Sequence, residues 1–345
     1  MAQINKPTDY FNTVLYTGNG TTDRTVTGVG HQPDFTIIKN RDNTFGSRFF
    51  DVIRGATKEI TSNTSNAEAT NAEGLKSFNS DGFTLGNHGG TNENNSGMVS
   101  WNWKANGAGS SNTDGSITST VSANTTAGFS IVSFTGTGAN GTVGHGLGET
   151  PKMIIQKNLS ITSAWSVWHG SFNGNQVIYL NETGAVGTNT SSWNSTVPTS
   201  SVFSVGTGSY PNGSGNEQIY YVFAEKKGFS KIGTYIGNGN ADGTFVYTGF
   251  KPAFLLYKSA DQNSNWLMWD SKRPGYNLTD KLVMPNLVDN EQTSTSDALD
   301  FLSNGFKFRG TGAATNGSGQ AVIYMAFAEE PLVANVGQSI PATAR

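Results

Sequence analysis

The chain has 345 residues, and its composition already excludes several classes of protein. Gly (43), Thr (40), Asn (36) and Ser (35) make up 154 of these residues, whereas charged residues make up only 14%. A helix bundle or coiled coil is excluded because long amphipathic helices need more Ala, Leu, Glu, Lys and Arg. The 20 Phe, 11 Tyr and 7 Trp can build a core, which argues against disorder. We therefore predict an all-β protein of many short strands joined by Gly and Asn turns.

The charge and the N-terminal residues limit partners and location. The net charge is −3, which does not imply the basic surface that nucleic-acid binding needs. No apolar run approaches the roughly 20 residues that span a bilayer, so we expect no membrane insertion. Residues 1–10 (MAQINKPTDY) lack the apolar segment of a secretory signal, which predicts synthesis in the cytoplasm without a signal peptide. The absence of Cys excludes disulfides and thiolate metal sites, but it does not fix the compartment.

In chain order, a short arm at residues 1–10 is followed by a pattern that occurs three times. The openings at residues 11–20, 129–138 and 229–239 are similar (FNTVLYTGNG, FSIVSFTGTG and FSKIGTYIGNG). Each opening leads to a Pro, an apolar run with a Lys six residues on, a polar residue 18 residues on, and a later Ser-Gly pair. The members are Pro33, Pro151 and Pro252; Lys39, Lys157 and Lys258; Asp51, His169 and Asp270; and Ser96-Gly97, Ser214-Gly215 and Ser318-Gly319. Landmarks that keep step through three copies predict an internal triplication.

The triplication sets the predicted domain boundaries. The three units span residues 11–106, 129–227 and 229–330, and a tail follows at 331–345. Residues 107–128 contain no aromatic residue and are rich in Gly, Ser, Thr, Asn and Ala, which predicts a flexible or extended linker. Only Gly228 separates the second and third units, so we expect these two to pack rigidly.

Each unit, of about 100 residues, has the size of one compact antiparallel β-sandwich. Its short runs of Val, Ile, Thr, Phe and Tyr favour strands, and frequent Asn-Gly pairs favour tight hairpin turns. We expect the sandwich interiors to be filled by aromatic residues, namely Trp165, Trp168, Trp266 and Trp269. The sequence predicts one weak helix, at Asp297–Leu302 within STSDALDFL.

Five residues form the candidate site, because they occupy equivalent positions in the repeat. Asp51 with Arg54 and Asp270 with Arg273 share the spacing Asp-x-x-Arg, whereas the second unit has His169 there. One interpretation is a carboxylate held by a guanidinium in a binding cleft. The other, which we favour, is a structural ion pair that fixes the turn after a strand. No spacing brings together two carboxylates of the kind that acid–base catalysis requires.

Other candidate chemistry has weaker support, and we predict no catalytic residue, no cofactor and no metal centre. His31, His88, His145 and His169 do not have zinc-ligand spacing, and no Gly-x-Ser-x-Gly nucleophile motif occurs. The segment Asp261-Gln-Asn263-Ser-Asn265 matches the start of a calcium loop but lacks its Gly and its distal Glu. An exposed turn is the simpler interpretation, although a calcium ion between loops stays open.

Several of these motifs together resemble a known module. They are YTGNG, the loop from Val143 through His145 to Pro151, the I-I-x-K strand, and a closing strand that ends in Phe-Ala-Glu. This module is similar to one in virion proteins of tailed bacteriophages, including marine phages and those of cyanobacteria, and the opening residues 4–11 share the likeness. The resemblance covers residues 4 to about 333. It implies lectin-like, concanavalin-like jelly-roll sandwiches and carries no catalytic residues.

The sequence thus leads to three functional hypotheses, beside the option of a purely structural adaptor whose units pack subunits together. The first is a non-enzymatic virion surface protein, as a tail fibre, spike or host-attachment component, on the particle exterior. Its expected partners are other virion proteins, a host surface glycan and further copies of the chain in a homotrimer. The second is a head fibre or cement protein that decorates the capsid, since only a short arm precedes the first unit. The third is a carbohydrate-binding module or depolymerase, which would require exposed Trp residues.

Overall fold

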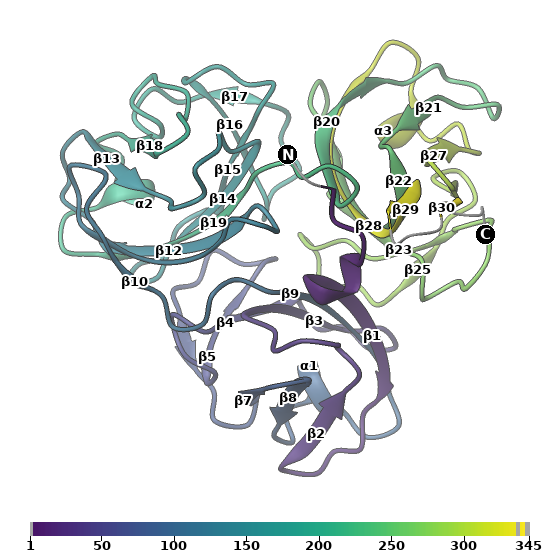
Figure 1. The fold of residues 1–345 in the computed structure, drawn as a ribbon, viewed down its shortest axis with the longest axis horizontal. Coiled ribbons are helices and arrows are strands. Elements are labelled where there is room, and N and C mark those ends of the chain that lie inside the picture. Colours follow the sequence, from purple (N-terminus) through teal and green to yellow (C-terminus); the bar gives the residue numbers. More distant parts are fainter. Residues whose placement is uncertain (1–2, 336–338, 342–345) are drawn as a thin grey trace.

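The computed structural model describes residues 3–335 and 339–341, and it shows an all-β protein (Figure 1). All named strand pairs are antiparallel, and the sheets form a sandwich-like fold. Helical structure in the described part of the chain is limited to single turns. These are the 3-10 turn η1 (Pro7–Asp9) and the α-helical turns α1 (Gly89–Asn92), α2 (Ser209–Asn212) and α3 (Ala313–Asn316).

The first unit consists of one large and one small sheet. The large sheet has the order β1-β9-β3-β4-β5-β6. Its strands are β1 (Phe11–Thr17), β9 (Gly97–Trp103), β3 (Phe35–Asn40), β4 (Arg48–Asp51), β5 (Lys58–Thr61) and β6 (Ala69–Thr70). The small sheet consists of β2 (Arg24–Thr27), β8 (Gly82–Leu85) and β7 (Leu75–Asn79).

The second unit follows the same order but carries two additional strands at one edge. Its large sheet runs β10-β11-β12-β19-β14-β15-β16-β17. These strands are β10 (Ser110–Asn112), β11 (Ser119–Asn124), β12 (Phe129–Thr135), β19 (Glu217–Phe223), β14 (Met153–Asn158), β15 (Ser166–His169), β16 (Gln176–Tyr179) and β17 (Gly187–Thr188). The small sheet pairs β13 (Gly141–Gly144) with β18 (Val202–Val205).

The third unit has a four-stranded large sheet, β20-β28-β22-β23. Its strands are β20 (Ser230–Ile236), β28 (Ala321–Pro331), β22 (Phe250–Ser259) and β23 (Leu267–Asp270). Smaller sheets contain β21 (Phe245–Tyr247), β27 (Gly305–Phe308) and β26 (Leu299–Leu302), and the pair β24 (Lys281–Leu282) and β25 (Gln292–Thr293). After it, β29 (Val333–Asn335) pairs with β30 (Ser339–Pro341), and the rest of the predicted tail lies outside the described residues.

Strand register places the sequence landmarks of the three units at matching positions. In the first unit, Phe35 of β3 pairs with Trp103 on one side and Asp51 on the other. In the second unit, Met153 pairs with Phe223 and His169. In the third unit, Phe254 pairs with Phe327 and Asp270. Phe35, Met153 and Phe254 each lie two residues after the landmark Pro of their unit. The constant distance from the Pro therefore corresponds to the same strand register in all three units.

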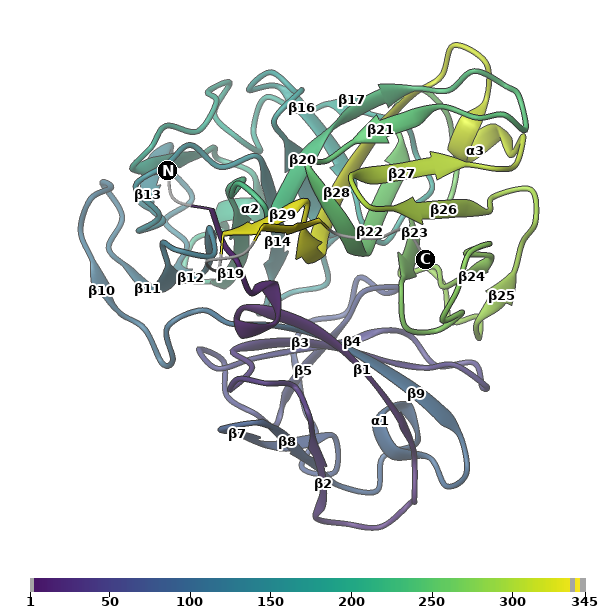
Figure 2. The ribbon, with the colours of Figure 1, turned by 45° about the vertical axis from the view of Figure 1, so that its right-hand side comes forward.

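The large sheets are apolar on both faces because each face is covered. Side chains alternate along a strand, so on β3 Phe35 and Ile37 point toward the other units while Ile38 packs in a separate cluster with Phe83 and Leu85 of the small sheet. The three units lie around a common centre, with their large sheets turned inward (Figures 1 and 2). One continuous hydrophobic cluster therefore includes residues from all three units.

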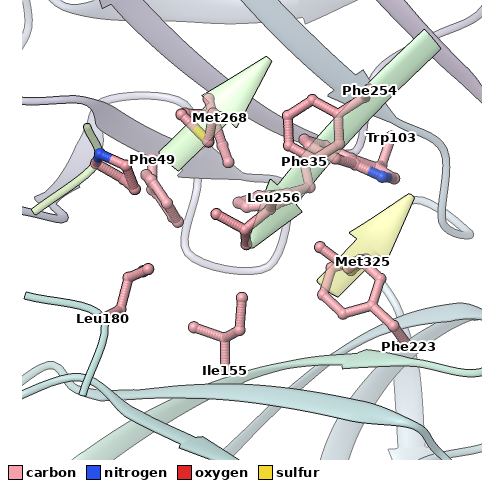
Figure 3. A pocket seen from close by; sticks show the side chains of 12 residues that line it. Phe35, Phe49, Trp103, Ile155, Leu180, Phe223, Phe254, Leu256, Met268 and Met325 are labelled. Carbon is pink, nitrogen blue, oxygen red and sulfur yellow. The ribbon is translucent and has the colours of Figure 1, made fainter. Parts of the chain in front are cut away.

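That shared core leaves only a small cavity of about 20 Å³, lined entirely by apolar side chains (Figure 3). Phe35 and Phe49 come from the first unit, Ile155 from the second, and Leu256 and Met325 from the third. The volume is close to the minimum for one water molecule, and no polar group lines the space. It is consequently a packing gap at the centre of three units, far below the size of a ligand pocket.

Residues 107–128, predicted as a linker, instead include two strands of the second large sheet. β11 pairs with β12 from Thr120↔Ser133 to Asn124↔Phe129, and β10 pairs with β11. The linker prediction was based on composition. It was wrong because a strand near the edge of a sheet gains main-chain hydrogen bonds even where its side chains bury little apolar area. The segment that connects the first and second units therefore belongs to the large sheet of the second unit.

Three further sequence expectations need correction. Residues 299–302 of the predicted helix form β26, because Leu299 and Phe301 alternate into the core of the third unit. The Ser-Gly landmark is shifted by two residues in the first unit: Asn95 (φ 61°) there takes the place of Gly215 and Gly319 (both φ 75°). Trp165 and Trp266 lie between units rather than in a unit's interior, since Trp165 Nε1 donates to Thr64 O of the first unit and Trp266 Nε1 to Tyr179 O of the second.

The N-terminal arm lies against the junction of the second and third units. Ile4 N donates to Lys227 O, and the Tyr10 ring meets the Phe229 ring edge-on at 6.0 Å between centroids. The arm is therefore packed against the rest of the protein, at the junction of the second and third units. Within residues 3–335 and 339–341, no helix is long and apolar enough to cross a membrane.

Candidate functional site

Asp51 and Asp270 end equivalent strands, β4 and β23, and each is fully buried. Oδ1 of Asp51 accepts hydrogen bonds from the main-chain N of Ile53 and Arg54, and Oδ1 of Asp270 does the same for Lys272 and Arg273. The other oxygen of each carboxylate accepts from the arginine Nε at 2.5 Å. The Asp-x-x-Arg spacing thus closes a turn and pairs the two charges.

The arginines are satisfied on their remaining nitrogens. Arg54 donates to Phe49 O and Glu68, and Arg273 donates to Met268 O and Glu291. Burial opposes the charged form of Arg54, yet its pKa is raised by Asp51, Tyr221 and Glu68. These contacts favour the structural interpretation, because a buried charge that lost its partner would be costly.

Each carboxylate also binds a side chain from another unit. The Tyr221 hydroxyl of the second unit donates to Asp51 Oδ2 at 2.8 Å. The Trp101 Nε1 of the first unit donates to Asp270 Oδ2 at 3.1 Å, and the Arg273 guanidinium lies over the Trp101 ring. Tyr221 and Trp101 occupy matching positions on β19 and β9. The first unit thus contacts the second, and the third contacts the first, by the same geometry.

His169 takes this position in the second unit and faces the third. Its Nδ1 accepts from the main-chain N of Ser171, so it closes the turn as the carboxylates do. Phe172 stands where the other units have Arg, and its ring packs on His169. Burial lowers the pKa of His169 to about 4, an effect that the Tyr324 main chain of the third unit partly opposes. His169 is therefore neutral at pH 7, and no charge is buried at this contact.

The five predicted site residues are consequently not one site. They lie at three contacts arranged in sequence around the centre: first to second, second to third, and third to first. Main-chain hydrogen bonds follow the same cycle, from Glu68 N to Leu159 O, from Val186 N to Ala260 O, and from Glu291 N to Arg41 O. The role that the geometry supports for these residues is to fix the units to one another.

A second repeated feature is a buried lysine at the end of each central strand. Lys157 Nζ donates to Asn158 O and Ser163 Oγ, and Lys258 Nζ donates to Ser259 O and Ser264 Oγ. Lys39 Nζ instead reaches the Phe45 and Val288 carbonyl groups. Burial lowers the pKa of each lysine to about 8. The lysines tie a loop to its strand, and Lys39 also ties the first unit to the third.

The remaining sequence candidates occupy separate structural positions. His31 bonds to Thr8 O, His88 to Gly90 N and His145 to Leu147 N. In the calcium-like segment, Asp261 accepts from Ala321 N, Asn263 from Ala185 N and Asn265 from Asn286. Among the described residues, no group of three or more His, Cys, Asp or Glu side chains could hold a metal ion.

Sequence reasoning missed the buried asparagines that close the three helical turns. Asn92, Asn212 and Asn316 are fully buried, and each amide nitrogen donates to two carbonyl groups, for example Gly86 O and Thr21 O for Asn92. Each side-chain oxygen accepts from the main chain after the first strand of its unit. The only signal available was an Asn three residues before the αL position, which many turn asparagines also satisfy.

Comparison with known proteins identifies one family. Residues 6–331 match the model of a domain of unknown function (DUF7483), so the match spans all three units. The chain belongs to this family. No curated protein matches the sequence. The family description assigns no chemistry to the domain.

Proposed function

We propose that this protein is a non-enzymatic component of the exterior of a tailed-bacteriophage particle, acting as a tail fibre, spike or host-attachment protein. We take the three units to be tandem jelly-roll, concanavalin-like sandwiches. The observation that supports it most is that buried polar and charged groups, among them Asp51 and Asp270, hold the three units together. Such an arrangement suits a protein that must stay folded outside cells without disulfides.

The surface also supports a contact role over a catalytic one. The buried carboxylates already accept several hydrogen bonds each, so neither is free to act as a base or nucleophile. Residues 182–201 of the second unit are rich in Thr, Ser, Asn and Gly, and Thr183, Thr190, Ser195 and Ser200 are exposed there. Such a segment offers neutral hydrogen-bonding groups to a host surface.

Analysis of purified particles by mass spectrometry and cryo-electron microscopy tests this proposal. We expect the chain in washed particles at tens of copies, placed at the tail. Its absence from particles would overturn the proposal. Hundreds of copies on the capsid lattice would instead support the head-fibre or cement alternative. Light scattering on the purified chain would test the homotrimer, which stays a prediction.

One observation argues against a carbohydrate-binding module or depolymerase that stacks sugar rings on exposed Trp side chains. All seven Trp side chains are at most 3% exposed, so none offers a flat ring on which a sugar can stack. A glycan contact on this protein must therefore rely on amides and hydroxyls.

A further inference from the structure

The third unit carries an open groove of about 450 Å³, which lies within the size range of small-molecule sites. It lies between the loop at 262–265, the region 292–297 and the turn α3. Its walls present amide and hydroxyl groups, and its apolar surface is formed by Met284, Ala313 and Ala314, beneath which Leu267 and Leu282 are buried. This combination offers polar contacts around a small hydrophobic floor.

Two asparagines of the groove have unused hydrogen-bonding capacity. Asn263 accepts from Ala185 N through Oδ1, but its exposed amide nitrogen has no partner in the part of the chain that the structure describes. Asn265 accepts from Asn286, while its amide nitrogen donates only to the thioether sulfur of Met284 at 3.3 Å. A thioether is a weak acceptor, so a ligand hydroxyl would be a better partner for this donor.

The charge of the groove favours an uncharged ligand. Among the described residues that line it, Asp297 is the acidic one and none is Lys or Arg, but Lys281 Nζ lies at its rim and donates to Thr293 Oγ1 at 2.6 Å. The Asp297 carboxylate already accepts from Ser294 Oγ and Thr315 Oγ1. One ammonium and one carboxylate, each already hydrogen-bonded, give the groove no excess charge that would favour an ion over an uncharged ligand.

The same position differs in the other two units. In the first, the Phe45 ring fills it and packs edge-on against His88, so that a Cβ added to Gly89 would lie 2.8 Å from the ring. In the second, Tyr210 stands on α2 where the third unit has Ala314 on α3, and a smaller groove of about 350 Å³ remains. The third unit thus has the most open and most amide-rich version.

We propose that this groove binds an uncharged oligosaccharide, with the asparagine amides contacting hydroxyls and the Met284, Ala313 and Ala314 surface contacting the C–H face of a sugar ring. This inference rests on the proposed host-attachment function, for which it names the ligand class. A single site without an aromatic platform gives weak affinity, on the order of 1 mM, which many copies on a particle would raise through avidity.

The test is a titration of the purified chain with maltose, cellobiose and lactose, with sialyllactose as the acidic comparison, followed by NMR and calorimetry. We expect at least one neutral disaccharide to shift signals of residues 262–265 and 292–297. The variant Ala314→Tyr, which copies Tyr210 of the second unit, should weaken binding by about tenfold or more. The matched control Tyr210→Ala changes the second unit and should leave this binding intact.

A second variant protects the test against misfolding. Asn263→Asp keeps the oxygen that Ala185 N needs but replaces the free amide donor by a charged oxygen, so it should fold and bind several-fold more weakly. Wild-type protein that binds none of the neutral sugars, or binding that both variants leave unchanged, would overturn the inference. Particles that contain the chain and still adsorb normally with Ala314→Tyr would refute the groove and leave the proposed function standing.

Discussion

The contact between the third and first units and the contact between the second and third units use one backbone geometry with different chemistry. In the former, Asp270 has an Arg three residues on and a facing donor, Trp101. In the latter, Phe172 replaces the Arg, and the facing position is Met325, which has no hydrogen to donate. His169 is accommodated there because a neutral imidazole needs neither an Arg in its own turn nor a hydrogen-bond donor from the facing unit. Of these three contacts, the two with a buried carboxylate are those where the turn and the neighbouring unit both supply donors.

The largest expected effect comes from breaking the charged contact. Asp270→Ala leaves Arg273 buried with reduced compensation and removes the acceptor of Trp101, so we expect a loss of about 3–5 kcal/mol in the free energy of unfolding. Asp51→Ala should behave alike at the first contact. Denaturant unfolding measures both.

The matched control is the exposed pair of Lys6 and Asp9, whose side chains are 72% and 45% exposed. Asp9→Ala should cost less than about 1 kcal/mol because surface ion pairs contribute little. If Asp270→Ala cost no more than this control, the buried pair would not hold the units together.

A smaller and uniform effect is expected where the three units do not differ. Asn92→Ala, Asn212→Ala and Asn316→Ala should each cost about 1–3 kcal/mol, since each leaves buried main-chain groups without a partner. Thermal unfolding of the three variants, with the exposed Asn106→Ala as the reference, checks this. A near-zero cost in one unit alone would show that its turn is held by other contacts.

The last expected effect is the pH dependence of the uncharged contact. His169 has a pKa of about 4 in the folded protein and about 6.5 when unfolded. The unfolded chain therefore binds the extra proton between these values, and stability falls as pH drops from 6.5 toward 4. His169→Gln should remove this contribution, at most about 1.4 kcal/mol per pH unit.

Urea unfolding at pH 7, 5.5 and 4.5 would compare the wild type with His169→Gln. The advantage of the wild type should shrink on acidification. A difference that stays constant over this range would show that His169 is not buried in its neutral form.

Local signals in the sequence predicted a large part of the fold. The Asn-Gly pairs and short β-branched runs indicated an all-β chain, and the constant spacing from each Pro marked residues that pair at one register. The candidate residues Asp51, His169 and Asp270, which were predicted as equivalent positions of the repeat, lie at the ends of equivalent strands. These successes share a cause, since turn chemistry and strand alternation depend on near neighbours in the chain.

Other features were beyond such signals. The strands at residues 110–112 and 119–124 have few apolar side chains, and only the open edge of β12 makes them strands. Likewise, nothing in the sequence around Trp165 or Trp266 distinguishes a sandwich interior from a contact between units. The groove of the third unit depends on Ala314 standing where another unit has Tyr210, across elements far apart in the chain.

The sequence by itself determined the class, the repeating pattern and the pairing of Asp with Arg across one turn, because each depends on residues within a few positions of one another. Only the tertiary structure decided that the large sheets face a common centre. That arrangement buries Asp51 against Tyr221 and Asp270 against Trp101, and it turns residues that looked like a site into contacts between units. Which face of a sheet meets water depends on what packs against it, and distant parts of the chain supply that packing.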